Sequence, residues 1–276
     1  MVSMDRIGCS TITFRMLPLE EALGQIAQRG LSTMDLGVIS RFCPHIDPLT
    51  ISDVELGQLA QKLQGLGLRV SSLNAWSLTH LNDADGLETE LPFLRASIRA
   101  ASRLGARVLS VQPGRKVAEG YWPEAADQVA QVLQTLGREA QELGLQLAIE
   151  APHKGTLAER FEDACRMIEM LDPSLVGVVL DSSHVLNAGA TIELALKRYG
   201  PRVCHVHLRD FRQGSILVTP GDGEVDFHEL FTGLARLGYR GEFNLELEYQ
   251  GYGAEQVATE LSRALDYLRK EPSHGQ

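Results

Sequence analysis

The chain has few cysteines and no long apolar run. Its 276 residues include four cysteines, and no two of them form a Cys-x-x-Cys pair, so neither a disulfide framework nor a zinc ribbon is expected. No apolar stretch approaches the ~20 residues of a membrane-spanning helix. The first residues, MVSMDRIGCSTITF, lack the apolar core of a signal peptide. We therefore expect a reduced, cytoplasmic protein that has no membrane partner.

The sequence also has no excess of positive charge. Lysine and arginine total 26 against 36 aspartates and glutamates, which gives a formal net charge of −10. Such a chain has no global basic field that would attract nucleic acid or an anionic membrane. The composition, 44% hydrophobic and 22% charged, is that of a globular enzyme. We therefore expect no nucleic-acid partner.

What the chain does contain is one repeated pattern. An amphipathic helical stretch ends in glycine and a short apolar strand follows, as in SRLGARVLSVQ and QELGLQLAIE. Glycine after a helix is the usual left-handed cap, because it has no Cβ to clash. Eight strands are predicted in this way, at Arg6–Ser10, Thr33–Gly37, Arg69–Leu73, Arg107–Val111, Gln146–Glu150, Gly177–Asp181, Arg202–Leu208 and Phe243–Leu247.

Eight strand–helix units in a chain of this length predict an α/β fold, a single (β/α)8 TIM barrel. No linker or charge run divides the sequence, so residues 1–276 are expected to form one domain. The alternative is an open doubly wound sheet. It is disfavoured because no glycine-rich phosphate loop follows the first strand.

Four consecutive predicted strands carry metal-binding side chains at their ends. Glu150 and Asp181 end the fifth and sixth strands, His207 lies on the seventh, and Glu246 lies on the eighth. Taken singly, an acidic residue at a strand end is more often a helix cap or a salt-bridge partner. In a barrel, however, these ends meet around one mouth. Several carboxylates with one imidazole would suit a divalent cation there.

Other polar residues lie near the same strand ends. Asn74 and Gln112 follow the third and fourth strands, and they would either contact a polar ligand or satisfy loop backbone. His205 lies one pleat deeper than His207 and is expected to be a hydrogen-bonded core histidine. Aromatic residues could form an apolar wall against a sugar ring or simply pack. The candidates are Phe14, Trp76 and Trp122.

Four strand-end segments, LAIEAPHKG, VVLDSSH, CHVHLRD and NLELEY, with PGDGEVDF before the last, resemble the xylose-isomerase-like TIM-barrel superfamily. Within it they are most similar to the sugar isomerase and epimerase branch, which includes ketose 3-epimerases and inosose isomerases. The resemblance covers nearly the whole chain. It implies four metal ligands, which are Glu150, Asp181, His207 and Glu246.

The resemblance also implies residues that bind substrate. The family's substrate-contacting histidine falls on His184. Ketose epimerases carry an arginine six residues after the histidine ligand, and this position is Gln213 here, with Arg212 one step earlier. Arg212 is therefore the candidate, at a position that departs from the family pattern.

The chemistry implied by the resemblance is proton transfer on a ketose, keto-polyol or sugar phosphate. One divalent cation, Mn²⁺ by preference over Mg²⁺, Co²⁺ or Zn²⁺, would stabilise an enediolate. Glu150 and Glu246 would abstract and return the proton. Relatives of this kind commonly form homodimers.

Three alternatives stay open. The same ligands would serve a dehydratase of a cyclic keto-polyol of the inosose or dehydroshikimate type. The superfamily's AP endonucleases carry further histidines, but Gln112 stands in the place of one and RQGSILVTPGDG has no Asp-x-His pair. A non-catalytic barrel that binds a sugar or a metal is the third. The PGDGEVDF segment either offers glycine amides to a phosphate or is a turn that leads to a helix N-cap at Asp226.

Overall fold

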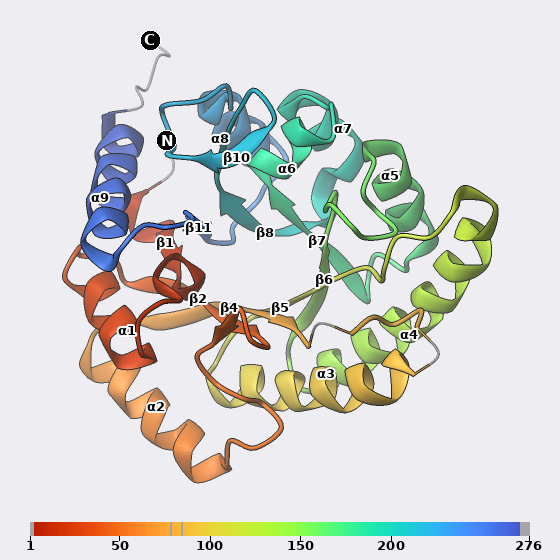
Figure 1. The fold of residues 1–276 in the computed structure, drawn as a ribbon, viewed down its shortest axis with the longest axis horizontal. Helices are drawn as coiled ribbons and strands as arrows, with labels where there is room; N and C mark the ends of the chain where they lie inside the picture. Colours follow the sequence, from red (N-terminus) through yellow and green to blue (C-terminus); the bar gives the residue numbers. More distant parts are fainter. Residues whose placement is uncertain (1–2, 78, 84, 271–276) are drawn as a thin grey trace.

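Eight parallel strands close into a barrel, as the sequence pattern predicts. The computed structural model describes residues 3–77, 79–83 and 85–270. Parallel pairing runs around the strands in chain order, and the last barrel strand returns to the first, which closes the sheet (Figure 1). The barrel strands are β1 (Ile7–Ser10), β2 (Thr33–Ile39), β4 (Arg69–Trp76), β5 (Val108–Val111), β6 (Gln146–Glu150), β7 (Val176–Asp181), β8 (Val203–Leu208) and β11 (Phe243–Leu245).

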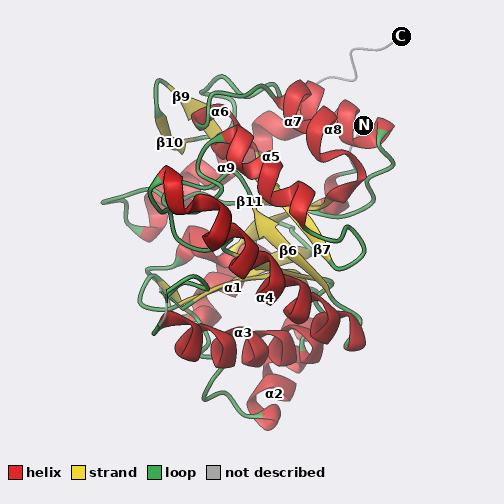
Figure 2. Ribbon diagram, turned by 90° about the vertical axis from the view of Figure 1, so that its right-hand side faces the viewer, coloured by secondary structure: helices red, strands yellow, loops and turns green. Residues whose placement is uncertain are grey.

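Helices follow every barrel strand and form the outer layer, as Figures 1 and 2 show. Two of them, α6 and α7, follow β7. Within the described ranges, no helix combines the length and the apolar character needed to span a bilayer. The helices are α1 (Leu19–Ala27), α2 (Asp53–Gly65), α3 (Gly86–Arg103), α4 (Trp122–Glu142), α5 (Phe161–Met170), α6 (Ser182–Asn187), α7 (Ile192–Tyr199), α8 (Phe227–Arg236) and α9 (Ala254–Lys270).

Local sequence signals explain where the helices begin and end. Ser52 forms a capping box with Glu55 at the start of α2. Asp226 accepts a hydrogen bond from the amide three residues on and caps α8, which confirms its predicted role. Gly144 and Gly238, which follow α4 and α8, have φ of 76° and 78°, as the left-handed caps require.

Three of the predicted strand ends differ from the structure, and each difference has a local cause. β2 runs past Gly37 to Ile39 because the short strand β3 (Cys43–Pro44) pairs antiparallel with its end. β4 runs past Leu73 to Trp76, which pairs with Ile39 at the extended end of β2. β11 stops at Leu245, short of the predicted Leu247. The Glu246 amide still donates to the Leu208 carbonyl at 3.3 Å, so Glu246 remains attached to the barrel.

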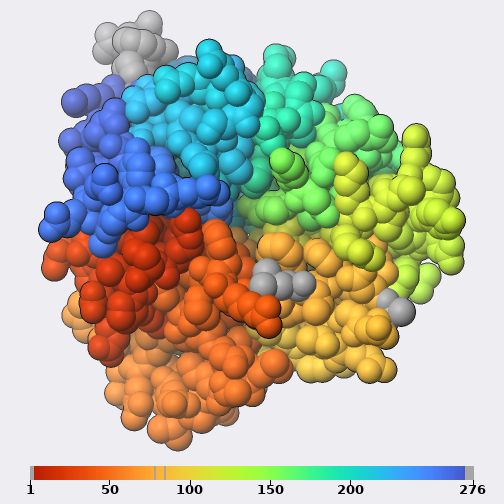
Figure 3. Space-filling model, viewed as in Figure 1, coloured from red at the N-terminus to blue at the C-terminus, as the bar shows by residue number. Residues whose placement is uncertain are grey.

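After β8 the chain forms a hairpin that the apolar pattern does not predict. Strands β9 (Asp210–Arg212) and β10 (Ser215–Val218) pair antiparallel, and Gln213 and Gly214 turn the chain with φ of 52° and 80°. Figure 2 shows the hairpin projecting at one end of the barrel. In the space-filling view of Figure 3, segments from all parts of the chain meet around the centre of the face seen in Figure 1.

The loop that follows the hairpin is organised by one buried carboxylate. Asp210 accepts four backbone hydrogen bonds of 2.8–3.0 Å, whose donors are Phe211, Gly221, Gly223 and Val225. A carboxylate that accepts several amides holds a loop firmly. The glycine amides of PGDGEVDF are therefore already occupied, which removes the phosphate interpretation of this segment.

Below the mouth, the barrel interior is polar and hydrogen-bonded around His205. Its Nε2 lies 2.9 Å from the Ser72 hydroxyl and 3.2 Å from the Asn244 side-chain nitrogen. Ser72 donates in turn to Asp35 at 2.5 Å, so it is free to accept from the imidazole. These contacts confirm the prediction that His205 is a hydrogen-bonded core histidine.

Gly8 is needed for this packing, because a Cβ there would overlap the side chain of Asn244 and the backbone of Thr33. We expect Gly8→Ala to lower the free energy of unfolding by about 1–3 kcal/mol, the usual cost of overpacking. The matched control is Gly24→Ala on α1, where a Cβ meets open space. That variant should gain about 0.5–1 kcal/mol. Denaturant unfolding of both variants measures the difference, and equal stabilities would contradict this account.

Candidate metal centre and active site

The four predicted ligands converge at the C-terminal mouth of the barrel. Glu150 ends β6, Asp181 ends β7, His207 pairs with Asp181 across the β7–β8 ladder, and Glu246 directly follows β11. One donor atom of each lies within 4.8 Å of the others, and all four side chains are buried. Parallel strands bring these positions together because their ends share one rim.

The arrangement fits a divalent cation, because it leaves buried donor atoms unsatisfied. Asp181 accepts from the His184 amide through Oδ1, while Oδ2 is buried with no hydrogen-bond partner among the described residues. A buried oxygen without a hydrogen bond costs about 1–3 kcal/mol. The nearest positive charge to Oδ2 is Arg209 Nε, at 3.8 Å. His207 presents Nδ1 to the cluster, 2.8 Å from Glu150 Oε1 and 3.7 Å from Glu246 Oε2. Three carboxylates and one imidazole are ligands suited to Mn²⁺, Mg²⁺, Co²⁺ or Zn²⁺.

A cavity of about 270 Å³ opens above the cluster. Of the four clustered residues, Glu150 and Glu246 line it, whereas Asp181 and His207 lie buried outside its lining. The lining combines four apolar or aromatic side chains with polar and charged ones. The lining residues are Ile39, Phe42, Asn74, Trp76, Gln112, Glu150, His153, Lys154, His184, Arg209, Ile216, Glu246 and Glu248.

Asn74 and Gln112 lie in the cavity, and each contacts one of the two glutamates. Asn74 Nδ2 donates to Glu246 Oε2 at 3.5 Å, and Gln112 Nε2 donates to Glu150 Oε2 at 3.3 Å. The sequence predicts that these amides touch a polar ligand. In the structure they also orient the carboxylates that the ligand would meet.

The arginine that lines the cavity is Arg209, not the predicted Arg212. Arg212 is exposed on the hairpin, where it donates to the Asp222 carbonyl, and it does not line the cavity. Arg209 is buried and reaches Glu246 at 3.2 Å and Glu248 at 3.4 Å. The sequence signal that could have identified Arg209 is the alternation of side-chain direction along a strand. Arg209 is two residues after His207, so the two side chains point to the same side where the chain leaves β8.

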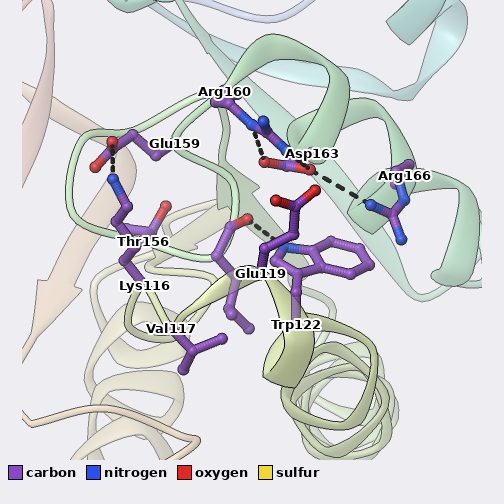
Figure 4. A pocket seen from close by; sticks show the side chains of 10 residues that line it. Lys116, Val117, Glu119, Trp122, Thr156, Glu159, Arg160, Asp163 and Arg166 are labelled. Carbon is purple, nitrogen blue, oxygen red and sulfur yellow. Dashed lines mark hydrogen bonds and ion pairs between the residues drawn. The ribbon is translucent and has the colours of Figure 1, made fainter.

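The three aromatic candidates lie in three different parts of the structure. Trp76 lines the cavity, whereas Phe14 is fully buried in the core. Trp122 borders a different cavity of about 210 Å³ between the loops after β5 and β6, shown in Figure 4. Its Nε1 donates to the Leu157 carbonyl at 2.8 Å, and Arg166 stacks over its ring.

The charges of this outer cavity are largely paired with one another. Lys116 binds Glu159 at 2.5 Å, and Arg160 binds Asp163 at 2.7 Å (Figure 4). These pairs leave few free groups for a ligand, so the outer cavity is not a competitor for the active site.

A search against protein-family models matches residues 23–271 to the family described as xylose isomerase-like TIM barrel. The chain belongs to this family. The resemblance inferred from the strand-end motifs is thereby confirmed.

Relatives of the chain within the xylose isomerase-like family include sugar-converting enzymes. An inosose dehydratase from Bacillus anthracis is 34% identical over 146 residues, which cover 46% of this chain and 49% of that protein. The chain thus spans about half the length of the curated relatives it matches. Among solved structures, the IolI protein with bound zinc has a TM-score of 0.80 at 21% identity, covering 97% of this chain and 99% of that one. D-psicose 3-epimerase has a TM-score of 0.77 at 15% identity, covering 96% and 98%. At these identities the structural likeness shows the fold alone.

In this family member the two glutamates differ in their electrostatic surroundings. Burial raises the pKa of Glu246 to about 8, although His207 and Arg209 oppose the shift. Burial acts on Glu150 in the same direction, but the hydrogen bond and the positive charge of His207 prevail and hold the pKa of Glu150 well below its usual value. In the metal-free protein near neutral pH, Glu150 is ionised and Glu246 holds a proton.

The two histidines of the site also differ. Burial disfavours the charged form of His207, but the carboxylates of Glu246, Glu150 and Asp35 outweigh it, and the pKa of His207 lies well above its usual value. Burial lowers the pKa of His184 to about 4, so its imidazole is neutral at physiological pH. A neutral imidazole can bind a cation or a substrate hydroxyl.

These shifts predict how the stability of the metal-free protein depends on pH. At neutral to mildly alkaline pH the folded state keeps protons on Glu246 and His207 that the unfolded chain has lost. The free energy of unfolding must therefore fall as pH rises towards the pKa values of these groups in the folded protein. We expect the thermal midpoint of chelator-treated protein to drop between about pH 7 and about pH 8.5. Glu246→Gln should show a smaller drop. A midpoint that rises over this window would contradict the assignment.

Proposed function

We propose that the chain is a divalent-metal-dependent isomerase or epimerase of an unphosphorylated ketose or keto-polyol. The observation that carries this proposal is that two of the four clustered residues, Glu150 and Glu246, also line the cavity. They come from strands separated by β7 and β8, so they approach a substrate from different sides. A bound cation would act as a Lewis acid toward the carbonyl and hydroxyl oxygens of the substrate.

The two glutamates suit a proton transfer. An ionised Glu150 can take the proton from the hydroxyl-bearing carbon next to the substrate carbonyl, and a protonated Glu246 can return one. Return to the other face of that carbon gives an epimer. Return to the neighbouring carbon gives an isomer. Gln112 and Asn74 keep both carboxylates directed at the cavity.

Other residues of the lining match a polyol. Ile39, Phe42, Trp76 and Ile216 offer an apolar surface to the C–H groups of a sugar. Arg209 and the neutral His184 offer hydrogen-bond donors to its hydroxyls.

The charge of the cavity favours a substrate without phosphate. Its basic side chains are Arg209 and Lys154, and Arg209 is already paired with two glutamates. Glu150, Glu246 and Glu248 line the same space and would repel a phosphate dianion. The glycine amides of the neighbouring loop are bound to Asp210.

A dehydratase of a cyclic keto-polyol is the second candidate, and one observation favours it specifically. Sequence relatives that are about a third identical to this chain, over about half of its length, are inosose dehydratases. The first step would be the same removal of a proton by a glutamate. The enediolate would then expel the β-hydroxyl as water, with the second glutamate as the proton donor.

The deciding experiment is isotope exchange. Metal-loaded protein is incubated in D₂O with a panel of ketoses, ketose phosphates and inososes, and each compound is analysed by mass spectrometry. We expect an unphosphorylated ketose or inosose to gain deuterium at unchanged composition. Glu150→Gln and Glu246→Gln should each slow this exchange by ~10²–10⁴-fold, the usual contribution of a general acid or base.

The other outcomes are equally informative. Loss of water from an inosose would identify the dehydratase. Exchange confined to ketose phosphates would contradict the charge argument. Absence of both exchange and water loss across the panel, with metal bound, would contradict the proposed chemistry and leave a non-catalytic barrel.

Arg209 gives a further prediction. Lysine keeps the charge but cannot bridge Glu246 and Glu248 as a guanidinium does. Arg209→Lys should therefore reduce kcat/KM by ~10²-fold through misplacement of the reacting groups. Arg212→Lys, on the exposed hairpin, is the matched control and should behave as wild type. Steady-state kinetics on the substrate found by exchange would test the pair, and the reverse ranking would restore Arg212 to the site.

A further inference from the structure

We propose that the chain holds a second divalent cation, between Glu150, His153 and His184. One donor atom of each of these residues lies within 4.8 Å of the other two. Two of the three, His153 and His184, do not belong to the ligand set described above. The two sets share Glu150 alone, so Glu150 would bridge two neighbouring cations.

The carboxylate of Glu150 already points in both directions. Its Oε1 lies 2.8 Å from His207 Nδ1, within the first set. Its Oε2 accepts from Gln112 Nε2 at 3.3 Å and lies 3.8 Å from His153 Nε2. A carboxylate with one oxygen in each set has the geometry of a bridging ligand.

His153 is oriented as a metal ligand. Its Nδ1 lies 3.0 Å from the Lys154 carbonyl oxygen, which can only accept, so the proton of a neutral ring resides on Nδ1. Nε2 is then unprotonated and faces Glu150. A backbone carbonyl that fixes the tautomer in this way is typical of histidines that bind metals.

His184 supplies the independent observation. The ring is 5% exposed, and its Nδ1 is buried with no hydrogen-bond partner among the described residues. The ring centroids of His184 and His153 are 4.7 Å apart. Asp181 caps the helix that carries His184 and accepts from its backbone amide at 2.8 Å, which fixes the backbone position of this residue.

Open space beside the three residues would complete the coordination. A cavity of about 240 Å³ borders both histidines and is also lined by Pro152, Lys154, Glu159, Asn187 and Ala188. Glu159 is not a fourth ligand, because it is bound to Lys116 and to the Gly155 amide (Figure 4). Water or a substrate oxygen would fill the remaining positions.

The two sets favour different cations. Three carboxylates and one imidazole accept Mg²⁺ or Mn²⁺, whereas two imidazoles and one shared carboxylate favour Zn²⁺ or Co²⁺. The second ion would also bind more weakly, because the first ion and the neighbouring Lys154 repel it. We therefore expect one Mn²⁺ per chain but two Co²⁺ or Zn²⁺ ions.

Occupation of this second site has a consequence for turnover, and that consequence alone rests on the proposed function. With Oε2 bound to a cation, Glu150 can no longer serve as the base. The second equivalent of Co²⁺ should therefore slow the exchange reaction towards the ~10²–10⁴-fold loss expected for a missing base.

The test is metal stoichiometry, which needs no substrate. Metal-free protein is titrated with Co²⁺ or Mn²⁺, free ions are removed, and bound metal per chain is measured by atomic spectrometry. Wild type should bind two Co²⁺ ions and His153→Ala one, while His228→Ala, at an exposed histidine on α8, should bind two. His207→Ala should bind one, and the double variant of His153 and His207 none.

A single Co²⁺ in wild type would overturn the second site. So would two ions that persist in His153→Ala, because the second ion would then lie elsewhere. Failure of the isotope exchange would refute the proposed function and leave these counts unchanged.

Discussion

Mutual repulsion among three buried carboxylates is the constraint on which the site depends. Glu150, Asp181 and Glu246 end neighbouring parts of one parallel sheet, and parallel pairing gives them no freedom to move apart. Burial makes their charges costly. The protein meets this cost in part by placing His207 and Arg209 among them, and by keeping a proton on Glu246. A divalent cation would supply the remaining positive charge, so the same feature that weakens the metal-free protein would favour the binding of a metal.

The rest of the barrel supports this arrangement from below and from the side. Beneath the ligands lies a polar floor, in which His205 is hydrogen-bonded to Ser72 and Asn244 donates to Ser71 at 2.8 Å. Beside them, Asp210 binds four backbone amides and shapes the loop near the mouth. Both features use polar groups for structure at positions that could be mistaken for catalytic ones. The distinction is that the Asp210 carboxylate and His205 Nε2 have hydrogen-bond partners, whereas Asp181 Oδ2 has none among the described residues.

Glu150 takes part in both proposals for this site, the proton transfer and the second cation. Its Oε1 faces the ligand cluster, and its Oε2 faces both the substrate cavity and the two histidines outside the cluster. The same oxygen could therefore act as a base or as a ligand, but not as both at once. Which cation is present would then decide between activity and inhibition, since imidazole-rich sites favour Zn²⁺ and Co²⁺ over Mg²⁺. This competition follows from the position of a single carboxylate on β6.

The sequence by itself determined the barrel and its four clustered residues. Glycine-capped helices alternating with apolar strands leave few other folds, and ligands at the ends of consecutive strands must meet in a closed parallel sheet. Features that depend on loops were decided only by the tertiary structure. Arg212 and Arg209 are three residues apart, and only the β9–β10 hairpin shows that one is exposed and the other buried. His153 lies in an irregular loop, so no periodicity could predict that it meets His184 across the mouth. Strand ends are set by local hydrogen bonding, whereas contacts between loops depend on how the whole chain packs.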